Sequence, residues 1–204
     1  MKVYEYEGKN LNELKEKVFT ELNANEQELY IRTSEEAGGF LKHKKYKIFA
    51  LPKDEVVKYS KSFVVDIAKY MGLNVNIEAK KRERYIELNL FSDKSSILIG
   101  KNGKNLEALQ LLIKNSILNT TGFKVNVILD VEDYKEKVSK HLEYNVKKIA
   151  REVKKTGVSA KLDPMNSYER RIVHNAVNEI SGVVTKSEGE EPNRYIVISV
   201  RKED

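Results

Sequence analysis

The polar and apolar positions of the first 50 residues predict a small β-α-β-β unit. KVYEY alternates in the manner of a half-buried strand. Asn10 and Glu13 then form a capping-box pattern at the start of a helix. The apolar stripe of this helix comprises Leu11, Leu14, Val18, Phe19 and Leu22. ELYIR and YKIFAL have the composition of strands and flank the turn-like EEAGGF.

Residues 53–132 predict the order α-β-β-α-α-β. A first helix, which Asp54 is placed to cap and Gly72 to end, precedes the strands VNIEAK and YIELNLF. A short helix over about residues 93–99 is interrupted by the run Gly-Lys-Asn-Gly at 100–103. A longer helix and the strand FKVNVILDV follow. The positions of the longer helix expected to face inward are Leu106, Leu109, Leu112, Ile113 and Ile117.

Residues 133–204 predict the order α-β-α-β-β. A long amphipathic helix ends near Lys155, and VSAKL follows as a strand. Asn166 and Glu169 form a second capping box at the start of a helix. VVTKSEG and RYIVISV, separated by EEPN, form a hairpin.

The three patterns together predict an α+β protein of three small domains, with boundaries at residues 1–52, 53–132 and 133–204. Positive charge rises along the chain: 9 basic and 9 acidic side chains in residues 1–52, 13 and 11 in 53–133, and 15 and 11 in 134–204. The net charge of +6 favours a polyanionic partner. A solvated, lysine-rich surface explains the same charge, so composition alone does not choose between them.

The chain contains no cysteine, which excludes disulfides, thiolate metal sites and cysteine nucleophiles. Its first residues, MKVYEYEGKN, lack the apolar core of a signal peptide. No apolar run approaches the ~18 residues of a membrane span. We therefore expect a cytoplasmic protein without an integral membrane segment.

The run from Gly100 to Lys104 has two interpretations. Its spacing matches neither a Walker loop nor a dinucleotide-binding fingerprint. Without Cβ atoms, Gly100 and Gly103 can let a sugar-phosphate chain lie against the backbone. The next helix would present free N–H groups there, and Lys101 and Lys104 would add charge around Asn102. The alternative is a plain turn between two helices.

Arg170 and His174 are spaced i, i+4, so one face of a helix carries both. Arg171 and Asn178 are placed on the same polar side. The opposite arc is apolar and comprises Ile172, Val173, Ala176, Val177 and Ile180. No nucleophile or carboxylate is placed to make His174 catalytic. A solvated polar face remains the plain alternative.

The α-β-β-α-α-β order with ILIGKNG between its central helices resembles a KH domain of the bacterial-type topology, over roughly residues 54–131. The resemblance implies that residues 100–103 clamp the backbone of about four unpaired nucleotides. It also implies an apolar groove for the bases beside this loop, with Ile97 and Ile99 as neighbours.

PMNSYERRIVHNAV, followed by KSEGEEPNRYIVI, resembles the single-stranded-nucleic-acid domain named for its Arg-x-x-x-His pair. The resemblance places Arg170 and His174 on a nucleic-acid surface, where arginine pairs with phosphate and histidine stacks or donates. Arg171 and Arg194 are further candidates, and Lys186 is a weaker one.

The three units in this order resemble the bacterial Jag family, also called SpoIIIJ-associated or KhpB. The N-terminal resemblance rests on the first helix, EEAGGFL and KKYKIFA. The family implies a single-stranded RNA-binding protein that acts as an RNA chaperone or post-transcriptional regulator, linked to cell-wall homeostasis and cell length. It further implies a small KH-only protein as partner. Single-stranded DNA as a ligand and a homodimer both stay open.

The basic stretch containing Lys44, Lys45 and Lys47 is a candidate interaction patch. Its alternative is an edge strand protected by lysines. A second hypothesis for the whole chain is a protein adaptor, because KH domains can pair and the first unit is electrically neutral.

An enzyme such as a nuclease is the third hypothesis, and it would need clustered carboxylates or histidines to hold a metal. His43, His141 and His174 fall in separate predicted elements, and the sequence shows no carboxylate cluster. We therefore predict no catalytic residue, no metal site and no cofactor.

Overall fold

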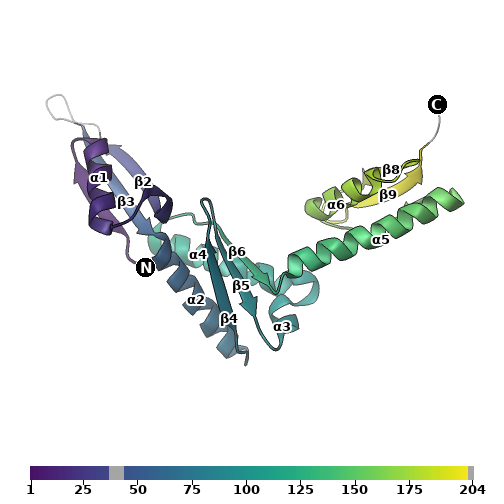
Figure 1. Cartoon of the computed structure of the whole chain (residues 1–204), viewed down its shortest axis with the longest axis horizontal. Coiled ribbons are helices and arrows are strands. Elements are labelled where there is room, and N and C mark those ends of the chain that lie inside the picture. The colour runs from purple at the N-terminus through teal and green to yellow at the C-terminus, as the bar shows by residue number, and fades with distance from the viewer. Residues whose placement is uncertain (37–43, 202–204) are drawn as a thin grey trace. The chain divides into compact units, whose positions relative to one another are not determined.

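The computed structural model describes residues 1–36 and 44–201. The chain divides into two compact units, Met1–Glu132 and Asp133–Asp204 (Figure 1). The first unit contains two three-stranded sheets and the second unit one, each covered by helices, so the predicted α+β class is confirmed. The predicted boundary after residue 52 lies inside the first unit and stays a prediction. Part of the turn predicted at EEAGGF lies outside the described residues.

The first sheet has the strand order β1-β3-β2, with all neighbours antiparallel. Its elements are β1 (Tyr4–Gly8), α1 (Leu11–Leu22), β2 (Leu29–Glu36) and β3 (Lys45–Pro52). Helix α1 packs Leu14 and Val18 against Leu29, Ile48 and Ala50. At its start, the side chain of Asn10 accepts a hydrogen bond from the amide of Asn12, as the predicted cap requires.

The second sheet has the order β4-β5-β6. Its elements are α2 (Lys53–Tyr70), β4 (Asn76–Lys81), β5 (Ile86–Phe91), α3 (Ser95–Ile99), α4 (Lys104–Thr121) and β6 (Val127–Val131). β4 and β5 are antiparallel, whereas β5 and β6 are parallel. A parallel pair needs a crossover connection, which α3 and α4 supply. Residues alternate between buried and half-buried along β5 and β6, and helices cover one face of the sheet.

Two expectations for these helices are wrong. Leu112 is 52% exposed, although Leu109 and Ile113 on either side of it are buried. Helix α4 contacts the sheet along one narrow stripe, and a step of about 100° per residue turns position 112 outward. Asp54 does not cap α2, because the cap position is Pro52 and has no side-chain hydrogen bond. Asp54 instead pairs with Lys81 at 2.9 Å.

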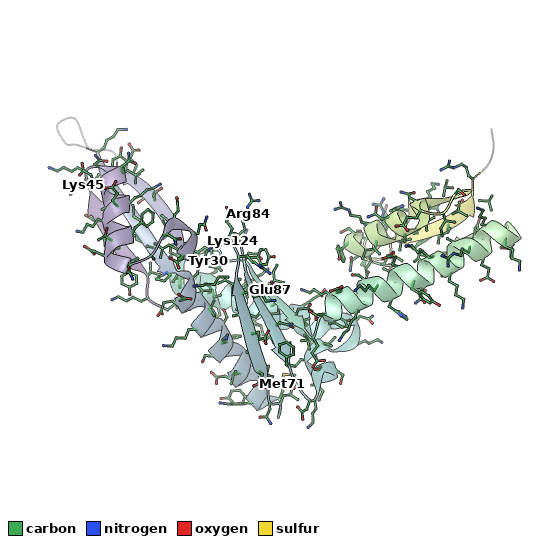
Figure 2. The ribbon with its side chains drawn as sticks, viewed as in Figure 1. Tyr30, Lys45, Met71, Arg84, Glu87 and Lys124 are labelled. Carbon is green, nitrogen blue, oxygen red and sulfur yellow. The ribbon has the colours of Figure 1, made fainter. Side chains whose placement is uncertain are left out.

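Side chains join the first sheet to one end of the second sheet. Arg32 in β2 donates from Nη1 to the carbonyl oxygen of Gly122 at 3.2 Å. Lys53 is buried and donates from Nζ to the carbonyl oxygens of Arg82 and Glu83, at 3.0 and 2.8 Å. Figure 2 shows Tyr30, Arg84 and Lys124 near this joint, which ties the first fifty residues to the middle of the chain.

The second unit has the sheet order β7-β9-β8, with antiparallel pairs. Its elements are α5 (Tyr134–Thr156), β7 (Ala160–Lys161), α6 (Ser167–Asn178), β8 (Val183–Glu188) and β9 (Tyr195–Val200). The core contains Val146, Ala150 and Val153 of α5, with Val173 and Val177 of α6 against the sheet. Asn166 and Glu169 form the predicted capping box at the start of α6.

Candidate nucleic-acid interface

The loop between α3 and α4 has a backbone that requires glycine. Gly100 adopts φ 69° and ψ −180°, a region that is essentially restricted to glycine. Asn102 and Gly103 also have positive φ, of 55° and 79°. A Cβ atom at Gly100 would lie 2.5 Å from Cγ of Asn105. The first glycine is therefore demanded by conformation and by close packing.

Asn105 holds this loop, and sequence reasoning missed that role. Its Nδ2 donates to the carbonyl oxygen of Ile97 at 2.8 Å. The bond satisfies a carbonyl in the last turn of α3, which has no partner inside so short a helix. Because Asn105 lies in the first turn of α4, one side chain connects both helices across the glycines. An asparagine directly after G-x-x-G-K was the available signal.

The loop presents positive charge to solvent. Lys101, Asn102 and Lys104 are exposed, while Gly103 is buried. Neither lysine forms an ion pair with any residue that the structure describes. Helix α4 begins at Gly103 without a side-chain cap, so backbone N–H groups and the positive end of the helix dipole are available here. The arrangement suits a phosphate.

Apolar side chains lie near the loop and along α4. Ile97 is 42% exposed and Ile99 is half-buried, whereas Leu98 between them is buried. A cavity of about 400 Å³ lies between α4 and the segment that leads into β6. Its lining combines leucines with lysines and amides: Leu111, Lys114, Asn115, Leu118, Lys124, Val125 and Asn126. Apolar surface beside cationic and amide groups suits bases and phosphates together.

The cavity residues were not predicted as site residues. The signal in the sequence was that Leu111 and Leu118 fall off the buried stripe of α4. Large apolar side chains outside the core stripe of a helix indicate a surface that binds something.

Arg170 lies at the second candidate site, but its surroundings differ from the expectation of a wet helical face. Its side chain is only 11% exposed. Nη1 donates to the carbonyl oxygen of Met165 at 3.0 Å, and Nη2 lies 2.7 Å from Oε1 of Glu191. The placement on the solvated side is wrong because the segment between β8 and β9 carries Glu191 to the guanidinium. A helical pattern contains no information about that segment.

The other predicted residues of this site lie on α6 and the β8–β9 hairpin, which pack together. His174 is bound through Nδ1 to Oγ1 of Thr185 at 2.5 Å. Its Nε2 has no hydrogen-bond partner among the described residues. Arg194 donates from Nε to Oγ of Ser187 at 2.9 Å, and Arg171 is exposed. The site therefore offers a positioned imidazole and free arginine donors.

Aromatic side chains complete this surface. Tyr168 is 63% exposed and lies three residues before Arg171, so both share one side of α6. Lys161 places Nζ 4.1 Å from the ring centre of Tyr195 in β9. Exposed tyrosine faces are platforms for unpaired bases. Sequence reasoning missed both tyrosines. An aromatic residue next to the Arg-x-x-x-His pair was the available signal.

The predicted basic patch is largely neutralised. Lys44 pairs with Glu35 at 2.6 Å. Lys47 lies 3.0 Å from Glu7 and 3.1 Å from Glu36, and these carboxylates raise the pKa of Lys47. The patch stays a prediction, but its charge is balanced within the first sheet. The remaining two residues of the basic stretch, at positions 42 and 43, lie outside the described residues.

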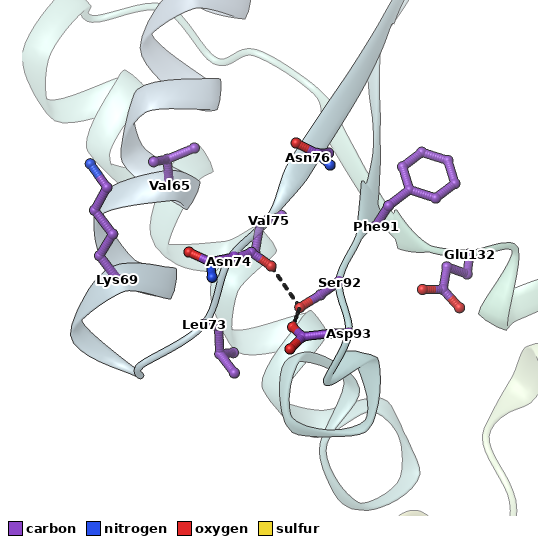
Figure 3. Close-up of a pocket in the computed structure, with 10 residues that line it drawn as sticks. All are labelled: Val65, Lys69, Leu73, Asn74, Val75, Asn76, Phe91, Ser92, Asp93 and Glu132. Carbon is purple, nitrogen blue, oxygen red and sulfur yellow. Dashed lines mark hydrogen bonds between the residues drawn. The ribbon is translucent and has the colours of Figure 1, made fainter.

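Figure 3 shows a further hollow of about 630 Å³, where α2 and β5 end. Lys69 lines it together with Asp93 and Glu132, so both charge signs are present. Ser92 donates to the carbonyl oxygen of Asn74 at 2.7 Å within it. None of the predicted site residues lines this hollow.

Over residues 1–36 and 44–201, the structure contains no group of three or more His, Asp or Glu side chains placed to hold a metal. No helix in that part of the chain is both long and apolar enough to span a membrane.

Comparison with known families places both sites in recognised domains. The family model of the KhpA/KhpB KH domain matches residues 56–129. The family model of the domain named for the Arg-x-x-x-His pair matches residues 140–200. The fold and the site thus define a protein with one KH domain and one Arg-x-x-x-His domain.

Whole-chain relatives specify the family. The RNA-binding protein KhpB of Bacillus subtilis is 30% identical over 201 residues, which cover 96% of this chain and 97% of the relative. KhpB of Clostridium symbiosum is 40% identical over 67% of this chain and 62% of the relative. KhpB of Streptococcus pneumoniae D39 is 35% identical over 71% of this chain and 43% of the relative. The chain belongs to the KhpB family, and the predicted resemblance is confirmed.

The match covers less than two-thirds of the length of the Clostridium and Streptococcus relatives. What those longer proteins do as a whole therefore enters only as a proposal for this chain.

Proposed function

We propose that this chain binds single-stranded RNA through two sites in tandem, the Gly100–Lys104 loop and the Arg170/His174 surface. The observation that carries the proposal is the loop: a glycine-only backbone, an uncapped helix start and two lysines without ion pairs in the described structure. The printed names of its KhpB relatives describe RNA-binding proteins, which supports the same ligand.

At the first site, a nucleotide backbone would lie against Gly100 and Gly103, with phosphate oxygens accepting from N–H groups at the start of α4. Lys101 and Lys104 would neutralise phosphate charge, and Asn102 would donate from its amide. Bases would then lie on the apolar side chains along α3 and α4, including Ile97 and Ile99. The cavity beside Lys124 would extend this path.

At the second site, His174 would act through the free Nε2, while Arg171 and Arg194 would contact phosphates. Exposed Tyr168 would stack on a base. Arg170 would contribute once its carboxylate partner is replaced. Binding at one site raises the effective RNA concentration at the other wherever one strand can reach both, so two weak sites give useful affinity.

The test of the loop is the double substitution Lys101→Asp/Asn102→Asp. RNA affinity should fall at least tenfold, and the salt dependence of binding should become shallower, because phosphate contacts set that slope. Lys9→Asp/Asn12→Asp makes the same change in charge on exposed residues of the first unit and should have a much smaller effect. Equal loss in both variants would mean that only net charge matters and would sink the loop assignment.

We further propose the roles that the family suggests: an RNA chaperone or post-transcriptional regulator in the cytoplasm, acting in cell-wall homeostasis and cell-length control, with a small KH-only protein as partner. Crosslinking in cells followed by sequencing of the bound nucleic acid tests the RNA role. Recovery of single-stranded DNA instead would change the ligand class.

A protein adaptor is the second candidate function, and the exposed face of α4 favours it. Leu111, Leu112 and Leu118 are exposed there, and an apolar face of this kind suits pairing with another KH domain or a second copy of this chain. Leu112→Glu should abolish such pairing in sedimentation experiments while leaving the fold intact. Contacts that survive nuclease treatment in a pull-down would favour the adaptor over RNA-mediated association.

A further inference from the structure

The ion pair between Arg170 and Glu191 is asymmetric in its exposure. The Arg170 side chain is 11% exposed, whereas that of Glu191 is 59% exposed, although Nη2 and Oε1 are only 2.7 Å apart. The cation is thus built into the domain, and the anion approaches it from the solvent side. An ion pair of this kind presents a fixed cation whose anionic partner is exchangeable.

The protein fixes Arg170 and its surroundings independently of Glu191. Nη1 donates to the carbonyl oxygen of Met165, and the amide of Met165 donates to the carbonyl oxygen of Arg194. The guanidinium is therefore held by one backbone segment that is itself anchored to the start of β9. Removing the carboxylate leaves these bonds in place, so the cation keeps its position.

The carboxylate belongs to a short turn between β8 and β9. Gly189 has φ +81°, and the amide of Asn193 donates to the carbonyl oxygen of Glu190 at 2.8 Å. Within this turn, Glu190 is exposed and has no ion pair among the described residues, whereas Glu191 reaches Arg170. Two neighbouring carboxylates therefore differ in one respect: only one of them occupies the guanidinium.

We propose that Glu191 occupies the phosphate position of the Arg-x-x-x-His site in the free protein, and that an RNA phosphate binds by exchanging with it. This inference rests on the proposed RNA-binding function. A phosphodiester offers oxygens with geometry similar to a carboxylate, and arginine accepts either in a paired arrangement. The guanidinium carries five N–H donors, and two are used by Met165 and Glu191.

The exchange has a consequence for specificity. A neutral ligand gains nothing from Arg170, because breaking the pair with Glu191 would leave a largely buried cation without an anion. A phosphate replaces the lost charge, so the site admits anionic strands and rejects neutral ones. Glu191 also weakens binding of every anion by the free energy of the ion pair that must be broken.

The test compares Glu191→Gln with Glu190→Gln in the full chain, using a fluorescein-labelled oligouridylate as the probe. Both substitutions remove one negative charge from the same turn, so the general electrostatic attraction to RNA changes equally. Glu191→Gln should bind about two- to fivefold tighter than Glu190→Gln, as release of a typical exposed ion pair would give. In an Arg170→Gln background the two variants should bind equally.

A second measurement follows Glu191 in the unaltered protein. Its carboxylate carbon signal in NMR should move towards that of Glu190 as oligouridylate saturates the protein. Equal affinities of the two glutamine variants, weaker binding by Glu191→Gln, or an unmoved carboxylate signal at saturation would each overturn the exchange while RNA binding stands. If the unaltered protein fails to bind the oligouridylate, the proposed function is wrong and the exchange is wrong with it.

Discussion

Arg32 in β2 donates a hydrogen bond to the carbonyl oxygen of Gly122, 90 residues further along the chain, at 3.2 Å. The same guanidinium lies over the rings of Phe49 and Phe123, at 4.8 and 5.4 Å from their centres. One side chain thus connects the first sheet to the loop between α4 and β6. That loop also supplies Lys124 to the cavity beside α4.

Arg32→Ala should loosen this joint. We expect a loss of about 1–2 kcal/mol in the free energy of unfolding, because a hydrogen bond and two cation–π contacts disappear. Hydrogen exchange should accelerate at the amides around Gly122, and urea unfolding measures the stability. Arg84→Ala, an arginine with no hydrogen bond or ion pair in the described structure, is the matched control. Equal effects of the two substitutions would contradict a specific joint.

Gly100→Ala should destabilise the α3–α4 loop by about 1–3 kcal/mol, because the backbone conformation is essentially glycine-only. The added methyl group would also meet Asn105 at 2.5 Å. RNA affinity should fall with the loss of loop geometry. Gly72→Ala is the control, since Gly72 also has positive φ, of +71°, but has open space around its Cβ position. A smaller loss for Gly100 than for Gly72, in thermal unfolding, would show that Asn105 does not hold the loop.

Arg170 and Arg171 should separate stability from binding. Arg170→Ala leaves the carbonyl of Met165 without its donor and opens space in a largely buried position. We expect a loss of about 1–3 kcal/mol in unfolding free energy. Arg171 is exposed, so Arg171→Ala should change stability by no more than about 0.5 kcal/mol while lowering RNA affinity. Urea unfolding and fluorescence anisotropy distinguish the two effects, and unchanged affinity of Arg171→Ala would remove it from the site.

Tyr30 should make stability sensitive to alkaline pH. Burial raises the pKa of Tyr30 to about 12, from about 10 in an unfolded chain. The folded protein therefore favours the protonated phenol, and this contribution is complete below about pH 10 and is lost as the pH rises through about 12. Tyr30→Phe should abolish that loss, which urea unfolding across this pH range measures.

The same substitution should leave stability near neutral pH unchanged or slightly higher. The hydroxyl oxygen of Tyr30 is buried, and it has no hydrogen-bond partner among the residues that the structure describes. Replacing it therefore removes an unsatisfied polar group. Tyr70→Phe is the control, because Tyr70 is 93% exposed. A similar pH response in both variants would contradict the assignment to Tyr30.

Local patterns were sufficient to predict most of the architecture. Strand alternation, helical stripes and capping boxes depend on neighbours within a few residues, so the β-α-β-β, α-β-β-α-α-β and α-β-α-β-β orders could be predicted. The G-x-x-G run and the Arg-x-x-x-His pair were also readable, because each motif is defined by short spacing. Charge and composition only narrowed the class of ligand.

Contacts between distant segments decided the rest. Leu112 could be placed outward only once the sheet showed which stripe of α4 it covers. Lys47 looked like part of a basic patch until two neighbouring strands brought Glu7 and Glu36 beside it. Arg170 looked solvated until the β8–β9 turn placed Glu191 on it. The sequence by itself determined the elements and the motifs; the tertiary structure decided which charges are free, because a charge is neutralised by whatever the fold places within a few ångströms of it.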